Sequence, residues 1–205
     1  MEIVTLPVGP LQANCILLFD EEKNAVVVDP GGDAQRILAE IRSRGLRVQA
    51  VLLTHVHFDH MLAAGEVQAA AGAPLWVPEG DEGALADPSR SLLGWMPGQG
   101  GLPLKPDRLV KEGDVLSVGA LRLTVIATPG HTPGSCCYRC ENVLLTGDTL
   151  FAGGVGRTDF PGGDFAALRQ SLRRLNNLEG DYMVLPGHGP STTLDGERRD
   201  NPYMQ

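Results

Sequence analysis

The sequence predicts an α+β fold, a four-layer αββα sandwich in which helices cover the outer faces of two packed sheets. Each half of the chain contains short strand-like runs followed by a helical run, and two sheets that each bury one face need helices on the other. At 205 residues the chain is long enough for one well-buried domain and too short for two large ones. We therefore expect residues 1–205 to form a single domain.

The first half of the chain predicts a strand meander, a helix, a buried strand, a second helix and a further strand. A Pro-Gly-Gly sequence stops the meander, Asp33 is expected to cap the first helix, and Gly45 and Gly72 are expected to end the two helices. The predicted strands are residues 3–8, 14–19, 25–29, 48–54 and 74–77, and the predicted helices are residues 34–44 and 62–71.

The second half repeats this order after a long loop. The loop, residues 87–106, is rich in Gly and Pro and carries Trp95 and Met96. We interpret it as a lid or binding loop, with a mobile segment as the alternative. The predicted strands that follow are residues 115–118, 121–128, 135–139, 142–146 and 182–185, and the predicted helix is residues 165–178.

The composition favours a small molecule as the partner. A formal net charge of −8 and a pI near 5.0 argue against a surface that binds nucleic acid or lies on an anionic membrane. The N-terminus lacks the pattern of a signal peptide, and no stretch reaches the roughly 18 apolar residues of a membrane span. We expect a soluble, cytoplasmic protein without nucleic-acid or membrane partners, and the sequence makes no prediction of its oligomeric state.

The four cysteines do not have the even spacing of a disulfide framework. Cys15 stands alone, whereas Cys136, Cys137 and Cys140 lie in one strand-like segment. Cys137 and Cys140 form a single C-x-x-C pair. We interpret these cysteines as small buried side chains or free thiols, with a zinc or redox site as the alternative.

All five histidines lie in sequences that resemble metal-binding turns, and none is left for another role. They are His55, His57 and His60 in Thr-His-Val-His-Phe-Asp-His, His131 in Pro-Gly-His-Thr-Pro-Gly and His188 in Pro-Gly-His-Gly-Pro. Imidazole is the commonest protein ligand for zinc and iron at neutral pH. The sequence therefore predicts a metalloprotein.

The spacing within the first motif predicts two metal sites close together. His55 and His57 are two residues apart, so their rings can face the same side of an extended backbone and share one metal. Asp59 and His60 follow at once, and a turn there would direct them toward a second metal.

Further ligands are expected from turns that follow the later strands. His131, Asp148 and His188 each come directly after a predicted strand, next to glycines that permit tight turns. Taken one at a time, each is more often an ordinary turn residue. Their combination with the first histidine motif favours the metal-ligand interpretation.

These motifs, in this order, resemble those of the metallo-β-lactamase superfamily, and specifically its glyoxalase II (hydroxyacylglutathione hydrolase) branch. The resemblance rests on the seven-residue histidine motif, the later Gly-His, Gly-Asp-Thr-Leu-Phe and Pro-Gly-His-Gly-Pro, and it covers nearly the whole chain. It implies two divalent metal ions, zinc, iron or manganese, with Asp59 and Asp148 as catalytic carboxylates. The implied ligands are His55, His57 and His131 for the first metal and Asp59, His60 and His188 for the second, with Asp148 and a hydroxide between them.

The resemblance implies hydrolysis of a small hydroxyacyl thioester such as S-lactoylglutathione. A thiolate is a good leaving group, because a thiol has a pKa of about 8.5, so its expulsion needs little help from a general acid. Proteins of this branch append a C-terminal helical region that contacts glutathione, whereas only 17 residues follow His188 here. We therefore expect the substrate contacts to differ.

Several residues around the implied metal centre are candidates for supporting roles. Arg157 is expected to bind a carboxylate of the substrate, and Asp29 either to hold a ligand histidine or to stabilise its own turn. Arg198, Arg199 and Tyr203 are weaker candidates, and we favour a solvated helix face for them.

Two other functions remain as alternatives. One is a persulfide dioxygenase with a single iron, a relative that shares the first histidine motif and a similar Gly-Arg-Thr-Asp-Phe, and the other is a non-catalytic metal-binding module. The retained His188 favours the two-metal hydrolase over the dioxygenase. The β-lactamases and RNA-processing nucleases of the superfamily fit less well, since the former commonly have cysteine at the position of Asp148 and the latter carry an inserted domain.

Overall fold

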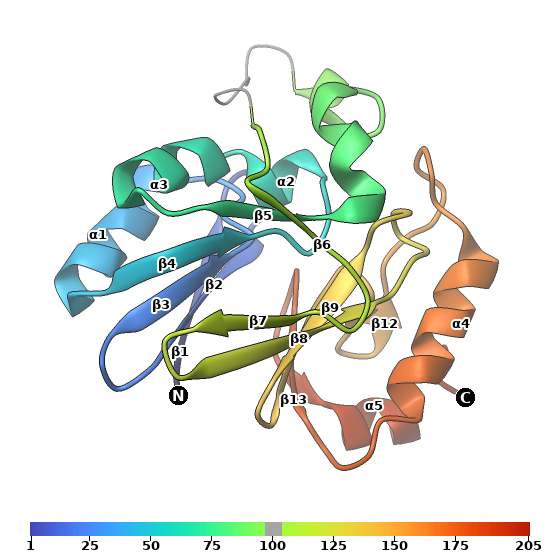
Figure 1. Ribbon diagram of the computed structural model, residues 1–205. Coiled ribbons are helices and arrows are strands. Elements are labelled where there is room, and N and C mark those ends of the chain that lie inside the picture. Colours follow the sequence, from blue (N-terminus) through green and yellow to red (C-terminus); the bar gives the residue numbers. More distant parts are fainter. Residues whose placement is uncertain (97–103) are drawn as a thin grey trace.

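Two six-stranded sheets face each other at the centre of the computed structural model, which describes residues 1–96 and 104–205. Helices α1 (Ala34–Arg44) and α3 (Ala64–Ala71) cover the outer face of the first sheet, and α4 (Phe165–Asn176) and α5 (Leu194–Asp200) cover that of the second (Figure 1). The predicted αββα sandwich is confirmed. In the part of the chain that the structure describes, no helix has the length and apolar character needed to cross a membrane.

The first sheet contains the predicted meander and continues with parallel strands. Its order is β1-β2-β3-β4-β5-β6, antiparallel from β1 to β3 and parallel from β3 to β6. The parallel crossovers are made by α1 and α3 and by the segment that follows β5. The strands are β1 (Glu2–Val8), β2 (Ala13–Phe19), β3 (Asn24–Val28), β4 (Arg47–Leu52), β5 (Leu75–Pro78) and β6 (Arg108–Val110).

The second sheet has the order β14-β13-β10-β9-β8-β7. Neighbouring strands of this sheet are antiparallel, except that β10 and β13 are parallel. Helix α4 lies in the connection between these two strands. The strands are β7 (Val115–Val118), β8 (Leu121–Ala127), β9 (Cys136–Cys140), β10 (Val143–Gly147), β13 (Met183–Pro186) and β14 (Thr192–Thr193), and a separate hairpin pairs β11 (Leu150–Phe151) with β12 (Gly154–Val155).

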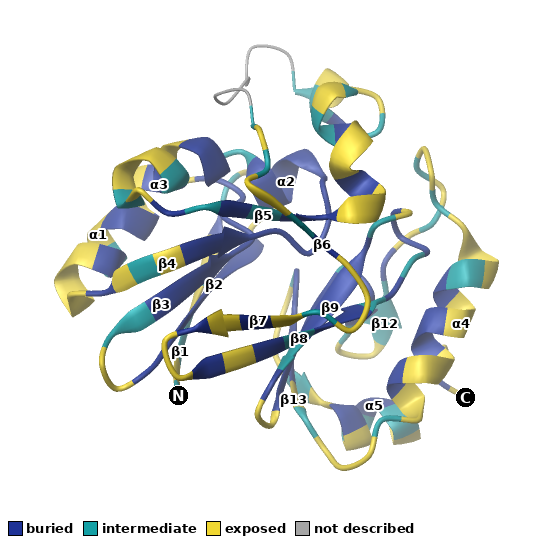
Figure 2. Cartoon of the chain, viewed as in Figure 1, coloured by how far each residue is buried: buried dark blue, intermediate teal, exposed yellow. Residues whose placement is uncertain are grey.

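Alternating side chains divide the interior into three apolar layers. In β2, Leu17 and Phe19 face the helices α1 and α3, whereas Ile16 and Leu18 face the second sheet. A third layer lies between the second sheet and the helices α4 and α5. Figure 2 shows the result, with buried central strands and outer helices that have one buried and one exposed face. Each fully buried large apolar side chain contributes about 1.5–3 kcal/mol.

The structure corrects the predicted role of Asp33 and adds elements that the patterns did not predict. Asp33 occupies the N-cap position, but with φ 50° its side chain makes no capping bond and instead accepts the Gly9 N–H at 3.0 Å. Of the predicted loop 87–106, residues 97–103 lie outside the described residues. The added elements are α2 (Phe58–Met61), the short 3-10 helices η1 (Glu79–Ala86) and η2 (Leu93–Trp95), the strands β6, β11, β12 and β14, and α5.

Candidate metal centre

The seven residues expected to bind metal come together where four strands end. The loop after β4 carries the first histidine motif, and the turns after β8, β10 and β13 carry the other three residues. The whole set is His55, His57, Asp59, His60, His131, Asp148 and His188. Strands of both sheets end on the same side of the sandwich, so residues far apart in the sequence meet there.

The ligand atoms form three overlapping groups, in each of which all atoms lie within 4.8 Å of one another. Asp148 contacts two sides of the cluster, with Oδ2 3.5 Å from His131 Nε2 and Oδ1 3.4 Å from His60 Nε2. The groups are His55 with His57 and His131, His55 with His60 and Asp148, and Asp59 with His60 and His188.

Three of the imidazoles are oriented by a hydrogen bond from Nδ1. His131 Nδ1 donates to the backbone carbonyl of Arg157 at 2.6 Å. His60 Nδ1 contacts Asp29 Oδ2 at 3.0 Å, where only the ring can donate to the ionised carboxylate. With Nδ1 donating in this way, the Nε2 atom of each ring would be the atom that binds a metal ion.

His55 is oriented through a relay. The Thr54 hydroxyl donates to Asp29 Oδ2 at 2.6 Å, which leaves its oxygen free to accept from His55 Nδ1 at 3.1 Å. The Thr54 backbone N–H also donates to Asp29, at 2.7 Å. Asp29 therefore orients His55 and His60 together, and of its two expected roles the geometry favours the holding of ligand histidines. Its own backbone adopts φ 51°, the left-handed region.

Unpaired atoms indicate that a cation belongs in the cluster. Among the described residues, four buried side-chain atoms lack a hydrogen-bond partner, and all four lie here. Buried polar atoms without partners are rare in native proteins, so their concentration requires an explanation. A bound metal would satisfy them, and the donor set of imidazoles and carboxylates fits zinc, iron or manganese. The four atoms are Nε2 of His55, His57 and His60, and Asp148 Oδ1.

The pKa values of the clustered histidines are shifted in opposite directions. Burial, together with the neighbouring histidines, holds the pKa of His55 well below its ordinary value and lowers that of His57 to about 3. Burial also acts to lower the pKa of His60, but Asp148 and Asp59 outweigh it and raise this pKa to about 10. His55 and His57 are therefore neutral imidazoles, the form that binds metals, whereas the carboxylates around His60 attract positive charge.

The backbone packs so closely against the cluster that one position beside it has room only for glycine. A Cβ atom at Gly187 would overlap Asp148 Oδ1 and would lie 2.8 Å from His60 Cε1. No residue with a side chain fits at that position without displacing a candidate ligand. The glycine beside His188 is thus a requirement of the site.

A cavity of about 590 Å³ opens onto the cluster. Five of the candidate ligands line it, and most of the other lining residues are apolar; the five are His57, Asp59, His131, Asp148 and His188. Arg157, the substrate-binding candidate, also lines the cavity. A volume in this range is typical of a site for a small molecule.

Comparisons with known proteins agree with this geometry. The family model described as the metallo-beta-lactamase superfamily matches residues 8–188. The chain belongs to this superfamily. The hydroxyacylglutathione hydrolase GloC of Haemophilus influenzae is 38% identical over 215 residues, which cover 100% of this chain and 98% of the relative.

Two solved structures are similar to this chain over nearly their whole length. The crystal structure of the BLEG-1 B3 metallo-beta-lactamase gives a TM-score of 0.93 at 36% identity and covers 99% of each chain. That of TTHA1623 in a di-iron-bound form gives a TM-score of 0.84 at 37% identity and covers 99% of this chain and 100% of that one.

Asp81 is a further buried carboxylate that the sequence analysis did not single out. It is 1% exposed, lies in η1, and accepts hydrogen bonds from three donors in two metal-site loops. Oδ2 accepts from the Val56 N–H at 3.1 Å and the Thr132 hydroxyl at 2.7 Å, and Oδ1 accepts from the Gly134 N–H at 2.8 Å. Asp81 thus joins the loop of His55 and His57 to that of His131.

The remaining candidates from the sequence lie away from the cavity. Arg198 donates to the backbone carbonyls of Asn176, Leu178 and Gly180, and so satisfies the end of α4 rather than a ligand. Arg199 and Tyr203 are exposed and do not line the cavity. The four cysteines are free and buried, and burial raises their pKa values, as expected for inert thiols.

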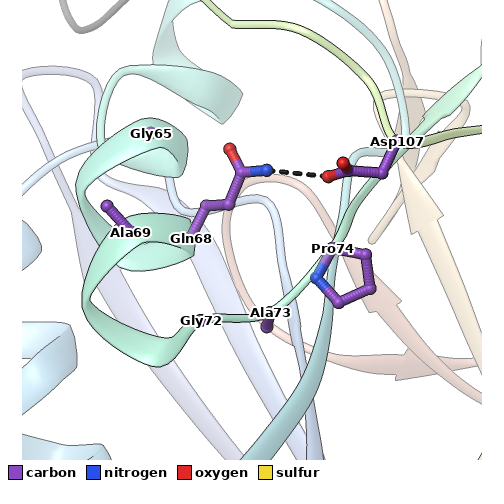
Figure 3. Close-up of a pocket in the computed structure, with 7 residues that line it drawn as sticks. All are labelled: Gly65, Gln68, Ala69, Gly72, Ala73, Pro74 and Asp107. Atoms are coloured by element: carbon purple, nitrogen blue, oxygen red, sulfur yellow. Dashed lines mark hydrogen bonds between the residues drawn. The ribbon is translucent and has the colours of Figure 1, made fainter.

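A second hollow, of about 560 Å³, lies on the outer side of the first sheet (Figure 3). Small residues of α3 and the turn after it line the hollow, and Gln68 Nε2 donates to Asp107 across it at 2.8 Å. Asp107 also accepts the Leu75 N–H at 2.8 Å, so this contact fixes α3 to β5. With no histidine in its lining, the hollow offers no comparable chemistry.

Proposed function

We propose that the protein is a binuclear metal-dependent hydrolase of acyl thioesters, with S-lactoylglutathione as the first substrate to test. The observation that carries the proposal is the convergence of seven imidazole and carboxylate side chains, which include four unpaired buried atoms, beside a cavity that five of the seven line. The similarity to a hydroxyacylglutathione hydrolase over the full chain supports the choice of substrate.

We assign His55, His57 and His131 to one metal, and Asp59, His60 and His188 to the other. Two bound divalent ions would supply hydroxide near neutral pH and polarise a carbonyl. Asp148 would connect the two sites, since its Oδ2 lies 3.5 Å from His131 Nε2 and 3.7 Å from His188 Nε2. Asp59 Oδ2 lies 3.1 Å from His188 Nε2, so both atoms are close enough to bind the same ion.

The residues of the cavity favour a thioester over an amide. In the overall reaction the water oxygen bonds to the carbonyl carbon and the C–S bond breaks, which gives a carboxylate, a thiol and one proton. Apart from Asp59 and Asp148, no carboxylic acid lies among the described residues that line the cavity, so none is free to protonate an amine leaving group. A thiolate leaves without that help.

Arg157 is proposed to contact an anionic part of the substrate. Its Nε and Nη2 donate to Asp159 at 2.6 Å each, and Nη1 remains available beside the cavity. Since the guanidinium is largely exposed, the expected contribution to binding is small.

The test combines metal content with turnover. Protein purified without added metal would be analysed for zinc, iron and manganese per chain, and then assayed for thiol release from S-lactoylglutathione. Nearly two metals per chain with turnover is the expected result, and His188→Ala should lower both. Two metals without thiol release from any thioester would overturn the proposal.

β-Lactam hydrolysis is a second candidate, favoured by the TM-score of 0.93 to a B3 metallo-beta-lactamase. It would use the same proposed metal ligands for attack on the lactam carbonyl, but the nitrogen leaving group would need a proton that a thiolate does not require. A cephalosporin assayed beside the thioester would decide between the two activities. One iron per chain, with oxygen uptake on glutathione persulfide and no hydrolysis, would instead identify the mononuclear dioxygenase.

A further inference from the structure

The walls of the active-site cavity are mostly apolar, which the metal centre itself does not require. Trp95, Phe160, Phe151 and Leu11 are among the residues that line it. Trp95 and Leu11 are 64% and 54% exposed, unusual values for large apolar side chains. Their exposed surface would be covered by an apolar ligand in the cavity.

Two of these residues continue the row of rings that begins at the candidate metal ligand His57. The Phe160 ring meets the His57 ring edge to face, with centroids 5.8 Å apart, and meets the Trp95 ring in the same way at 5.2 Å. We refer to Trp95 and Phe160 as the aromatic wall. A group bonded to a carbonyl beside His57 would lie against this wall, where edge-to-face contacts with a further ring are favourable.

The positive charge of Arg157, beside the aromatic wall, is already paired with a carboxylate. Arg157 packs on the face of Phe160, with the guanidinium carbon 4.0 Å from the ring centroid, and makes a two-fold ion pair with Asp159. Among the described residues that line the cavity, it is the one lysine or arginine. The guanidinium therefore supports the ring and keeps one nitrogen for a weak contact with an anionic group.

We infer that the aromatic wall is a subsite for an apolar group, aryl or alkyl, bonded to one side of the reacting carbonyl. The preferred substrates are then apolar thioesters rather than small hydroxylated ones. The inference rests on the proposed function for its reacting carbonyl, but the binding of an apolar group needs no turnover.

The first experiment measures binding without reaction. Thioethers of N-acetylcysteamine, which keep its amide but contain no thioester carbonyl to attack, would be titrated into metal-loaded protein by calorimetry, with S-benzyl and S-hexyl compared with S-hydroxyethyl. The apolar thioethers should bind at least about tenfold more tightly, and Trp95→Ala or Phe160→Ala should abolish most of that difference. Phe165→Ala, also an exposed phenylalanine at 48% but outside the cavity, is the matched control and should change nothing.

The second experiment identifies which side of the carbonyl contacts the wall. kcat/KM would be measured for acetyl, butanoyl and phenylacetyl thioesters of N-acetylcysteamine, and then for acetyl thioesters of N-acetylcysteamine, hexanethiol and phenylmethanethiol. If kcat/KM rises along the acyl series and Trp95→Ala removes the rise, the wall contacts the acyl side. The same result in the thiol series assigns the wall to the thiol side. Because Trp95 is largely exposed, its replacement should leave the fold intact, and circular dichroism would check this.

The outcomes separate the inference from the proposed function. Equal binding of apolar and polar thioethers, with thioester hydrolysis intact, overturns the subsite and leaves the hydrolase. Preferential binding of apolar thioethers that depends on the wall, without hydrolysis of any thioester, supports the subsite and overturns the hydrolase.

Discussion

Asp81 provides a sharp test of how the metal-site loops are held together. The proposed substitution is Asp81→Asn, which keeps the shape of the side chain and removes its charge. Glu82→Gln is the matched control, since Glu82 is the next residue of η1, is exposed, and loses the same charge. Both variants leave every candidate metal ligand in place.

The expected loss of stability follows from the three donors that Asp81 satisfies. An asparagine oxygen can still accept from Val56 and Thr132, but its NH2 group would then face the Gly134 N–H. The Gly134 N–H and the amide NH2 group are then left without acceptors, and two bonds lose their charge. Bonds to charged groups contribute about 1.5–3 kcal/mol, and an unpaired buried donor costs a similar amount, so we expect about 2–3 kcal/mol less free energy of unfolding.

The assay has two readouts. Urea unfolding of the metal-free proteins, followed by circular dichroism, gives the loss of stability independent of any ligand. Competition with a chromogenic chelator gives the metal affinity, which should fall about 10–100-fold, as is typical when a group that orients metal ligands is changed. Glu82→Gln should behave as the wild type within about 0.5 kcal/mol.

Two results would refute the reasoning. Unfolding of Asp81→Asn that is unchanged within about 0.5 kcal/mol would mean that the three hydrogen bonds contribute little to stability. Reduced stability with unchanged metal affinity would limit Asp81 to the fold and remove its role in positioning His55, His57 and His131.

Four further predictions follow from the same structure. Asp29→Asn should lower metal affinity about 10–100-fold, because His60 loses its charged acceptor, and a chelator competition would measure it. Removal of metal with a chelator should lower the melting temperature, and metal at 100 times its Kd should restore about 2.7 kcal/mol in calorimetry. Arg157→Ala should raise KM for a carboxylate-bearing thioester by up to about fivefold, and unchanged KM would reject its proposed contact. Hydrogen bonds from the Ala120 N–H and other groups lower the pKa of Asp20 to about 2. The ionised Asp20 therefore stabilises the fold above about pH 4, and this stabilisation is lost as the pH falls toward about 2. The difference in unfolding free energy between the wild type and Asp20→Asn should become smaller over that range.

Regular patterns explain why most elements could be predicted from the sequence. In β2 the alternation of side chains between two apolar layers fixes both the strand and its facing sides. Gly45 and Gly72 end α1 and α3 in left-handed conformations, as predicted. Short elements such as η1 and β6 had no such signal, because contacts with distant parts of the chain determine them.

The candidate ligands could be predicted, whereas the groups that orient them could not. Histidines in strand-end turns form a recognisable pattern, and the strand order brings those turns together. The contact of His131 with the carbonyl of Arg157 spans 26 positions and involves a backbone atom that every residue has. Asp33 shows the converse case, since a good capping residue was used for a longer-range bond to Gly9.

The candidate metal centre and the exposed residues that line the cavity differ in how far they are buried in the fold. His55, His60 and Asp29 are at most 2% exposed and are anchored to the central sheets, so a change there affects both the metal and the stability. Trp95 and Leu11 line the cavity with exposed side chains, and substitutions of exposed side chains typically change stability by less than about 0.5 kcal/mol. The substrate preference can therefore change while the metal centre is kept. Such a division fits a superfamily in which relatives named for hydroxyacylglutathione hydrolysis and for B3 metallo-β-lactamase activity both resemble this chain along almost its whole length.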